Sequence, residues 1–135
     1  MSIQYQPIDE TCLEAVKDLY RQHQWAAYLG DDDKLRRALR NSSYLLGAFD
    51  GATLAGFVRC VGDGEHVVLV QDLIVAKAYQ RRGIGAALLQ KASERYRHVR
   101  ALYIVTDLQD ADSNAFYRAQ GWRTLQDVSC VGYLR

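Results

Sequence analysis

A short stretch near the middle of the chain has the composition of an anion-binding turn. Gln80-Arg81-Arg82-Gly83-Ile84-Gly85 follows an apolar segment, residues 69–75, and precedes a segment with helical spacing. A strand that enters a helix through such a turn directs unpaired backbone N–H groups and the positive end of the helix dipole to one point. Glycine lets a phosphate approach the backbone and tolerates a positive φ, and arginine pairs with phosphate oxygens. These residues predict a pyrophosphate site.

The spacing differs from two other phosphate-binding motifs. It is not G-x-G-x-x-G and lacks the acidic residue that would contact a ribose, which argues against a dinucleotide. It is not G-x-x-x-x-G-K-[ST], which excludes a P-loop. The alternatives that stay open are a glycine-rich turn without a ligand and a nucleotide-binding regulatory domain that uses the turn for a different phosphate.

Two signatures resemble those of the GCN5-related N-acetyltransferase (GNAT) superfamily. The turn resembles its acyl-coenzyme-A loop, Q/R-x-x-G-x-G/A. Asn114-Ala115-Phe116-Tyr117-Arg118-Ala119-Gln120-Gly121-Trp122 resembles its second signature, a helix that carries F/L-Y and is followed by G-F. Because both occur in the family's order with a strand between them, the chain is identified as a small, bacterial-type, single-domain member.

The resemblance implies an enzyme that uses acetyl-CoA as cosubstrate, needs no metal, and acetylates a primary amine by direct attack in a ternary complex. The acetyl carbonyl would accept a hydrogen bond from the backbone N–H of Leu73 or Ile74. Tyr117 would donate a proton to the leaving sulfur. The residues expected to bind acetyl-CoA are Leu73, Ile74, Val75, Gln80, Arg81, Arg82, Gly83, Ile84, Gly85, Ala86, Asn114 and Tyr117.

Several groups are candidates for taking the proton from the amine. Most amines are protonated at neutral pH, so a carboxylate, acting directly or through water, would help. Asp107 ends one strand and Asp72 lies on the neighbouring one, so both are candidates. Glu65 and His66 could relay through water, and bulk water is a further alternative. Either acid could instead be a solvated or capping carboxylate.

Aromatic residues between the first two helices predict the wall of an acceptor site. Trp25 and Tyr28 there loosely resemble the branch that includes plant arylalkylamine acetyltransferases, which favours a small aryl- or alkylamine. Asp32, Asp33 or Asp72 could hold its ammonium group. The alternatives are a protein N-terminus or lysine as acceptor, a non-catalytic acyl-CoA-binding module, and a purely packing role for Trp25.

Composition limits the class of protein. With 135 residues the chain is long enough for one domain, residues 1–135. Its net charge of +1 argues against a general nucleic-acid binder, which needs a basic excess. No apolar segment is as long as a membrane span, no signal peptide is recognisable, and the three cysteines are widely spaced. We therefore expect a cytoplasmic protein without a membrane or metal partner, and a homodimer is left open.

The pattern of elements predicts an α+β protein with the GNAT fold. The expected order is β-α-α-β-β-β-α-β-α-β, with about four helices and a mixed, mostly antiparallel sheet of six to seven strands. Asp50-Gly51 and Asp63-Gly64 predict two hairpin turns within residues 44–75, a meander that a Rossmann sheet would not contain. Residues 101–106 should form a strand buried on both faces, and residues 128–134 a closing strand.

Overall fold

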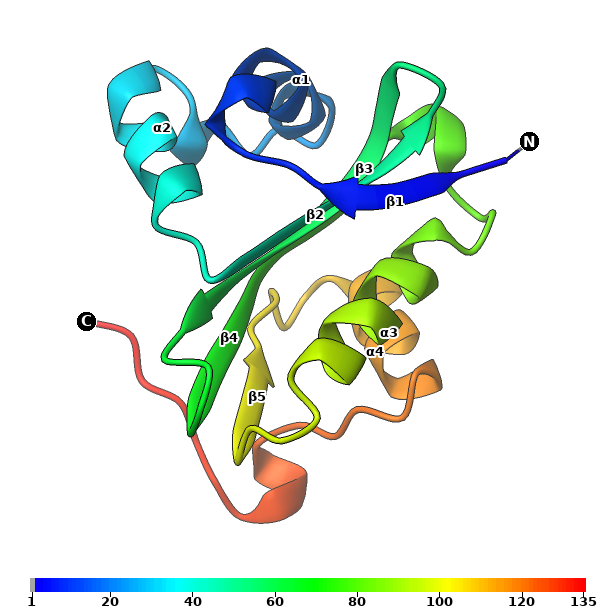
Figure 1. Ribbon diagram of the computed structural model, residues 1–135. Coiled ribbons are helices and arrows are strands. Elements are labelled where there is room, and N and C mark those ends of the chain that lie inside the picture. The colour runs from blue at the N-terminus through cyan, green and yellow to red at the C-terminus, as the bar shows by residue number, and fades with distance from the viewer. Residues whose placement is uncertain (1) are drawn as a thin grey trace. The chain divides into compact units, whose positions relative to one another are not determined.

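The computed structural model describes residues 2–135, which contacts divide into two compact units, Met1–Ile104 and Val105–Arg135. The first unit contains a five-stranded sheet with α1, α2 and α3, and the second contains α4 (Figure 1). In chain order the elements are β1 (Gln4–Pro7), η1 (Glu10–Cys12), α1 (Leu13–Gln22), η2 (Ala26–Tyr28), α2 (Asp32–Arg40), β2 (Tyr44–Asp50), β3 (Thr53–Gly62), β4 (Val67–Val75), η3 (Lys77–Tyr79), α3 (Ile84–Arg95), β5 (Ala101–Ile104), α4 (Ala111–Ala119) and η4 (Gln126–Val128), where η marks a 3₁₀ helix.

The strands lie in the order β1-β2-β3-β4-β5, antiparallel except for the parallel pair β4–β5. Both Asp-Gly turns are confirmed as hairpin connections, and their glycines, Gly51 and Gly64, have φ of +59° and +76°. In the second turn Asp63 accepts hydrogen bonds from the three backbone N–H groups at positions 65–67, which lower its pKa to about 2. The predicted α+β fold and element order are therefore confirmed through α4.

Two layers of helix enclose the sheet of the first unit. α1 and α2 cover one face, where Val16 and Leu19 pack in the same apolar cluster as Phe57 of β3. α3 covers the other face, where Leu88 packs in a cluster with Val58 of β3 (Figure 1). Adjacent residues of β3 serve opposite faces because side chains alternate along a strand. All five of these side chains are almost fully buried.

Local capping sets the ends of the helices. Asp31 precedes α2 and Asp110 precedes α4, and each accepts a hydrogen bond from the backbone N–H three residues later. Gly121, with φ of +89°, follows α4. Its N–H and that of Trp122 bond back to the last turn, Trp122 to the carbonyl of Tyr117 at 3.0 Å. Asp110 therefore sets the start of α4, and Gly121 sets its end.

The sheet has five strands in the described residues, not six to seven, because residues 128–134 do not form a strand. Thr124 and Asp127 hydrogen-bond each other, η4 follows, and Ser129 turns the chain at φ +63°. These local bonds replace the ladder that a strand would need. The apolar residues of the segment remain exposed, with Tyr133 at 94%.

The strand expected at residues 101–106 is shorter and less buried than predicted. β5 ends at Ile104 and lies at the edge of the sheet, where β4 is its only strand partner among the described residues. Tyr103 is 38% exposed. A continuous apolar run does not distinguish a central strand from an edge strand, so burial on both faces did not follow from it.

The close approach of β3 to β4 predicts a stability effect at Gly56. A Cβ there would lie 2.7 Å from the carbonyl oxygen of Ile74 and 3.3 Å from the Cα of Val75. Because both atoms belong to backbone, Gly56→Ala should lower the free energy of unfolding by about 1–3 kcal/mol, measured by urea denaturation. Gly132→Ala is the control, since its nearest contact is a side chain at 3.6 Å. Equal midpoints for the two variants would contradict the prediction.

Candidate functional site

β4 loses one of its two neighbours halfway along its length. Its last pair with β5 is Val70 with Ile104, whereas its pairing with β3 continues to Val75. Residues 71–75 therefore have a backbone edge that no strand of the first unit pairs. Such an edge offers a row of donors and acceptors to a ligand with complementary groups.

A β-bulge lies at the same point. On β3, Arg59 and Cys60 are consecutive, but their partners on β4 are Asp72 and Val70, so Gln71 is an extra residue. A bulge bends its strand and increases the local twist, and bulges are common beside active sites. Here it places the buried Asp72 directly across from Arg59.

Backbone alternation determines which groups lie at the unpaired edge. The N–H of Ala76 donates to the carbonyl of Ala55 on β3 at 2.7 Å, so Ala76 faces β3. Because successive residues face opposite sides, Val75 and Leu73 present their N–H and C=O groups to the unpaired edge. Ile74 faces β3. Of the two donors considered for an acetyl carbonyl, the geometry therefore favours Leu73.

The predicted phosphate turn leads from this edge into α3. Gly83 precedes the helix with φ of +80°, and a Cβ at this position would meet nothing within 4 Å. Arg81 also has a positive φ, +64°. The first helical bond is made by the N–H of Ala87 to Gly83 at 3.0 Å, so the N–H groups of residues 84–86 have no carbonyl one turn earlier to bond. This arrangement suits an anion.

The turn is held in place by contacts that no sequence motif predicted. The hydroxyl of Tyr79 donates to Asp50 at 2.6 Å, which ties η3 to the turn between β2 and β3. The guanidinium of Arg82 lies over the Tyr79 ring, 5.4 Å from its centre. The backbone N–H of Lys77 donates to the side chain of Gln22 at 3.0 Å.

Asp72 is the centre of a buried polar network on the face under α1 and α2. One carboxylate oxygen accepts from Arg59 Nε at 2.7 Å and from the Tyr20 hydroxyl at 2.8 Å. The other accepts from the Tyr28 hydroxyl at 2.7 Å. Arg59 also donates to Ser42 and to Tyr28, both at 3.3 Å. Asp72 is 2% exposed and Arg59 5%.

This environment makes Asp72 a poor candidate for the proton acceptor. Burial alone would lower the pKa of Arg59, but the charge and hydrogen bond of Asp72 outweigh it and raise that pKa above its ordinary value. Burial, and then Asp72, also raise the pKa of Tyr20. The arginine and both tyrosines thus remain protonated donors to Asp72, which leaves little access for a substrate proton.

Trp25 and Tyr28, the residues expected to form the acceptor wall, both contact the ring of Tyr20. Tyr28 stacks on it at 4.3 Å between ring centres, and Trp25 at 6.0 Å. The Tyr28 hydroxyl accepts from Arg59 and from Gln71 Nε2, at 3.3 and 3.1 Å, while donating to Asp72. It has therefore used its hydrogen-bonding capacity, and Tyr28 offers a substrate mainly its ring.

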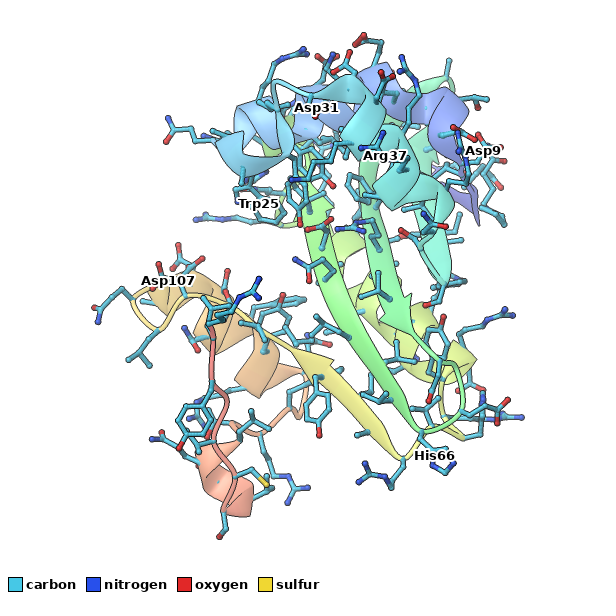
Figure 2. The ribbon with its side chains drawn as sticks, turned by 90° about the vertical axis from the view of Figure 1, so that its left-hand side faces the viewer. Asp9, Trp25, Asp31, Arg37, His66 and Asp107 are labelled. Carbon is cyan, nitrogen blue, oxygen red and sulfur yellow. The ribbon has the colours of Figure 1, made fainter. Side chains whose placement is uncertain are left out.

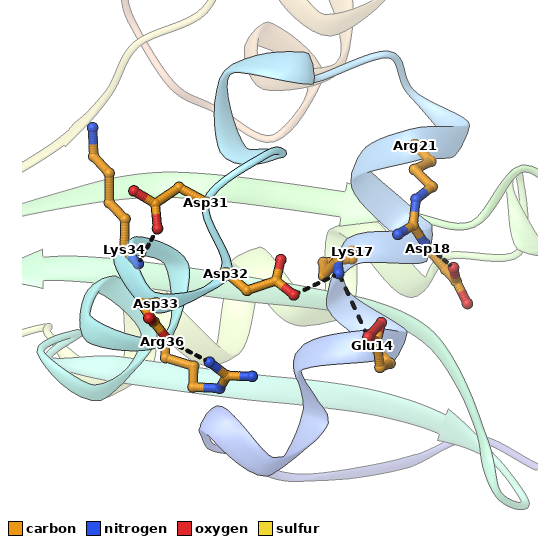
Figure 3. Close-up of polar contacts among 9 residues, drawn as sticks. All are labelled: Glu14, Lys17, Asp18, Arg21, Asp31, Asp32, Asp33, Lys34 and Arg36. Atoms are coloured by element: carbon orange, nitrogen blue, oxygen red, sulfur yellow. Dashed lines mark hydrogen bonds and ion pairs between the residues drawn. The ribbon is translucent and has the colours of Figure 1, made fainter.

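The acidic residues proposed to hold an ammonium group already have cationic partners (Figure 3). Asp32 pairs with Lys17 at 3.0 Å, and Asp33 with Arg36 at 2.7 Å. Asp31 accepts from the N–H of Lys34 as the cap of α2. Asp32 and Asp33 therefore each have a cationic partner, whereas the side chain of Asp31, which was not a candidate for the ammonium, accepts from a backbone N–H.

Glu65 and His66 lie at the wrong end of β4 for a water relay. Figure 2 shows His66 at the hairpin turn that precedes β4, at the opposite end of the strands from Trp25. β4 runs from Val67 to Val75, so about 26 Å of strand separates its two ends. That distance is too long for a proton relay through water between these residues and the other end of β4.

The remaining candidates belong to the second unit. Asp107 is exposed (Figure 2), and one of its oxygens accepts from the N–H of Gln109 at 2.8 Å. Asn114 donates to the carbonyls of Asp107 and Asp110 at 2.9 and 2.7 Å, so its side-chain oxygen remains available. Burial, and then the charge of Asp110, raise the pKa of Tyr117. Tyr117 therefore stays protonated at neutral pH, as a proton donor must.

Comparison with known proteins gives a family match over most of the chain. The sequence profile of the Acetyltransferase (GNAT) family matches residues 9–122. A GNAT family acetyltransferase from Streptococcus pneumoniae TIGR4 is 33% identical, with a TM-score of 0.82, and the alignment covers 99% of this chain and 96% of that one.

Two more distant structures share the fold. The PaiA N-acetyltransferase from Thermoplasma acidophilum, solved with coenzyme A, is 20% identical, with a TM-score of 0.75 and 91% of each chain covered. An aminoglycoside acetyltransferase from an uncultured soil metagenomic sample, solved with sisomicin, is 17% identical, with a TM-score of 0.71; 98% of this chain and 92% of that one are covered.

The Asp72 network predicts a large loss of stability when its charge is removed. Asp72→Asn leaves Arg59 buried without its counterion, which should cost about 3–5 kcal/mol, measured by urea denaturation. The control is Glu10→Gln, which breaks the largely exposed pair of Glu10 with Arg40 at 2.8 Å and should change the midpoint little. Similar small effects for both variants would show that the buried pair does not organise this face.

Proposed function

The chain belongs to the GNAT family of acetyltransferases, and from this we propose that it transfers an acetyl group from acetyl-CoA to a primary amine. The observation that supports this proposal most directly is the unpaired edge of β4 at Leu73 and Val75, which continues into the glycine turn before α3. We further propose that residues 1–135 act as one catalytic domain, because the family match runs through both units.

The residues present suit an acyl-CoA ligand in two respects. The free N–H and C=O groups of Leu73 are of the kind that amides of a pantetheine arm would pair with. The open space at Gly83 and the orphan N–H groups of residues 84–86 suit a pyrophosphate, with Arg81 and Arg82 adding positive charge. When bound, acetyl-CoA would supply a thioester whose carbonyl is open to attack by nitrogen.

The chain's own residues would polarise the thioester carbonyl, orient the coenzyme arm and move protons. The Leu73 N–H would donate to the oxygen that gains negative charge during attack, as an oxyanion-hole donor does. The hydroxyl of Tyr117 would protonate the departing sulfur, and Asn114 would contact the pantetheine arm through its free oxygen. Asp107, with one oxygen unpartnered within residues 105–135, is one candidate for the group that takes the proton from the amine.

For the acceptor we propose a small aryl- or alkylamine. The Tyr28 ring and Trp25 offer aromatic surface, while the nearby carboxylates Asp32, Asp33 and Asp72 are already paired. Recognition by ring contacts and shape is therefore favoured over recognition by an ion pair. A protein N-terminus or a lysine is the alternative acceptor.

The decisive experiment measures thiol release from acetyl-CoA in the presence of a panel of amines. The panel should contain arylalkylamines, aliphatic amines, and peptides with a free N-terminus or lysine. Turnover restricted to the small amines supports the proposal, and turnover restricted to peptides supports the alternative acceptor. Binding of acetyl-CoA without any turnover would identify a non-catalytic acyl-CoA-binding module instead.

The glycine turn predicts a specific loss of coenzyme affinity. Gly83→Val should abolish acetyl-CoA binding in calorimetry, because the side chain occupies the space through which phosphate approaches the backbone. Gly64→Val is a matched control: it has nearly the same φ, +76°, and also nothing within 4 Å of a Cβ. Both variants carry strain of the order of 1–3 kcal/mol. If a folded Gly83→Val protein binds acetyl-CoA as tightly as Gly64→Val, the phosphate site is elsewhere.

The proposed acid predicts a change in kcat. Tyr117→Phe keeps the ring, so its packing against Phe116, at 5.3 Å between ring centres, should persist. Loss of a general acid lowers kcat by about 10²–10⁴-fold, and we expect the low end because a thiolate leaves fairly well without a proton. Acetyl-CoA affinity should be nearly unchanged. A variant with the original kcat on its best amine would assign Tyr117 to packing alone.

A further inference from the structure

His23, the residue after α1, binds the unpaired edge of β4. Its Nε2 lies 2.7 Å from the carbonyl oxygen of Val75, which faces that edge. Leu73, the proposed donor to the acetyl carbonyl, presents its groups on the same edge two residues earlier. Two residues of strand span roughly 7 Å. The imidazole therefore lies beside the place where the reaction is proposed to occur.

The bond to Val75 determines the tautomer of His23. A carbonyl oxygen only accepts hydrogen bonds, so Nε2 must carry the hydrogen. In the neutral ring the lone pair is then on Nδ1. Within the described part of the chain Nδ1 has no hydrogen-bond partner, and the side chain is partly exposed. His23 thus presents an oriented, unused basic nitrogen.

The carboxylates considered for taking the proton from the amine do not combine a place at the unpaired edge with an atom free to accept that proton. Asp72 accepts from three donors in the buried network. Glu65 and His66 precede the far end of β4. Asp107, which belongs to the second unit, has one oxygen without a partner among residues 105–135.

We propose that His23 is the general base for the acceptor amine, an inference that rests on the proposed function. Nδ1 takes one proton from the acceptor ammonium and becomes imidazolium. The nitrogen lone pair forms the C–N bond as the C–S bond breaks, and the electron pair of that bond leaves on sulfur. The amine nitrogen also loses a second proton, which balances the proton that sulfur gains. The net reaction therefore releases one proton, which passes from His23 to water.

The charged and titratable groups on the elements around His23 have other partners or are exposed, so the lone pair of Nδ1 is not taken by them. The groups are Arg21 of α1, paired with Asp18; Tyr28 of η2, bonded to Asp72; Asp72 of β4, paired with Arg59; Tyr79 of η3, bonded to Asp50; and the exposed Lys77 of η3.

The test is His23→Gln in the full chain. The glutamine Nε2 can still donate to Val75, but it offers no basic nitrogen. We expect kcat/KM for the best amine to fall about 10²–10⁴-fold at neutral pH with acetyl-CoA affinity unchanged. The acidic limb of the wild-type pH profile should be replaced by activity that rises toward high pH, where free amine forms unaided.

His98→Gln is the matched control, because His98 makes the same kind of bond, Nε2 to the carbonyl of Gly64 at 2.8 Å, far from the edge. It should retain the wild-type rate and pH profile. A readout independent of turnover is the ¹⁵N spectrum of histidine-labelled free protein. The resonances lost in His23→Gln should show a hydrogen on Nε2 and none on Nδ1 at high pH.

Four results would overturn the inference. If the wild type is active and His23→Gln keeps its rate and acidic limb, the role of His23 is overturned while the proposed function stands. A spectrum with the hydrogen on Nδ1 has the same consequence. If Asp107→Asn removes the limb instead, Asp107 is the base. A wild-type protein that acetylates no amine overturns the proposed function together with this role.

Discussion

The ion pair between Arg59 and Asp72 joins β3 to β4 at the position where β4 has just lost β5. Burying two charges costs several kcal/mol for each ion, and the attraction between them compensates only when further hydrogen bonds complete the arrangement. Tyr20 and Tyr28 supply those bonds, and they also connect α1 and η2 to the sheet. Among the described residues, no buried side-chain nitrogen or oxygen lacks a partner.

The same constraint shapes the end of β4. The bulge at Gln71 brings Asp72 opposite Arg59, and from there the alternation turns Leu73 and Val75 toward the unpaired edge. Folded proteins normally pair or cover such an edge. Here the last residues are instead held from their other side, by the bond from the N–H of Ala76 to Ala55 on β3, and at one carbonyl by His23. The strand end is thus fixed in position while the Leu73 groups stay free, a geometry that supports the proposed transfer reaction.

Much of the fold was predictable because it depends on local signals. The Asp-Gly turns, the caps at Asp31 and Asp110 and the helix end at Gly121 are each decided by a few adjacent residues. The predictions were wrong where the pairing between strands decides whether a segment forms a strand and how deeply it is buried. Residues 128–134 are rich in apolar side chains, as a strand would be, but the N–H groups at positions 128–130 bond back to the carbonyls of Leu125 and Gln126, and the apolar run at residues 101–104 lies at a sheet edge. A hydrophobic pattern does not specify which partner a strand finds.

For the candidate site, the sequence by itself determined the local elements: the strand, the turn at Gly83 and the helix that follows, together with the helix that carries the Phe116-Tyr117 pair. These depend on φ preferences and on backbone groups, which adjacent residues control. Only the tertiary structure decided that Asp72 is committed to Arg59, Tyr20 and Tyr28, and that His23 reaches Val75. The Tyr20–Asp72 and His23–Val75 contacts each join residues 52 positions apart. The roles of such side chains depend on burial and on which donors surround them, and folding alone brings those donors together.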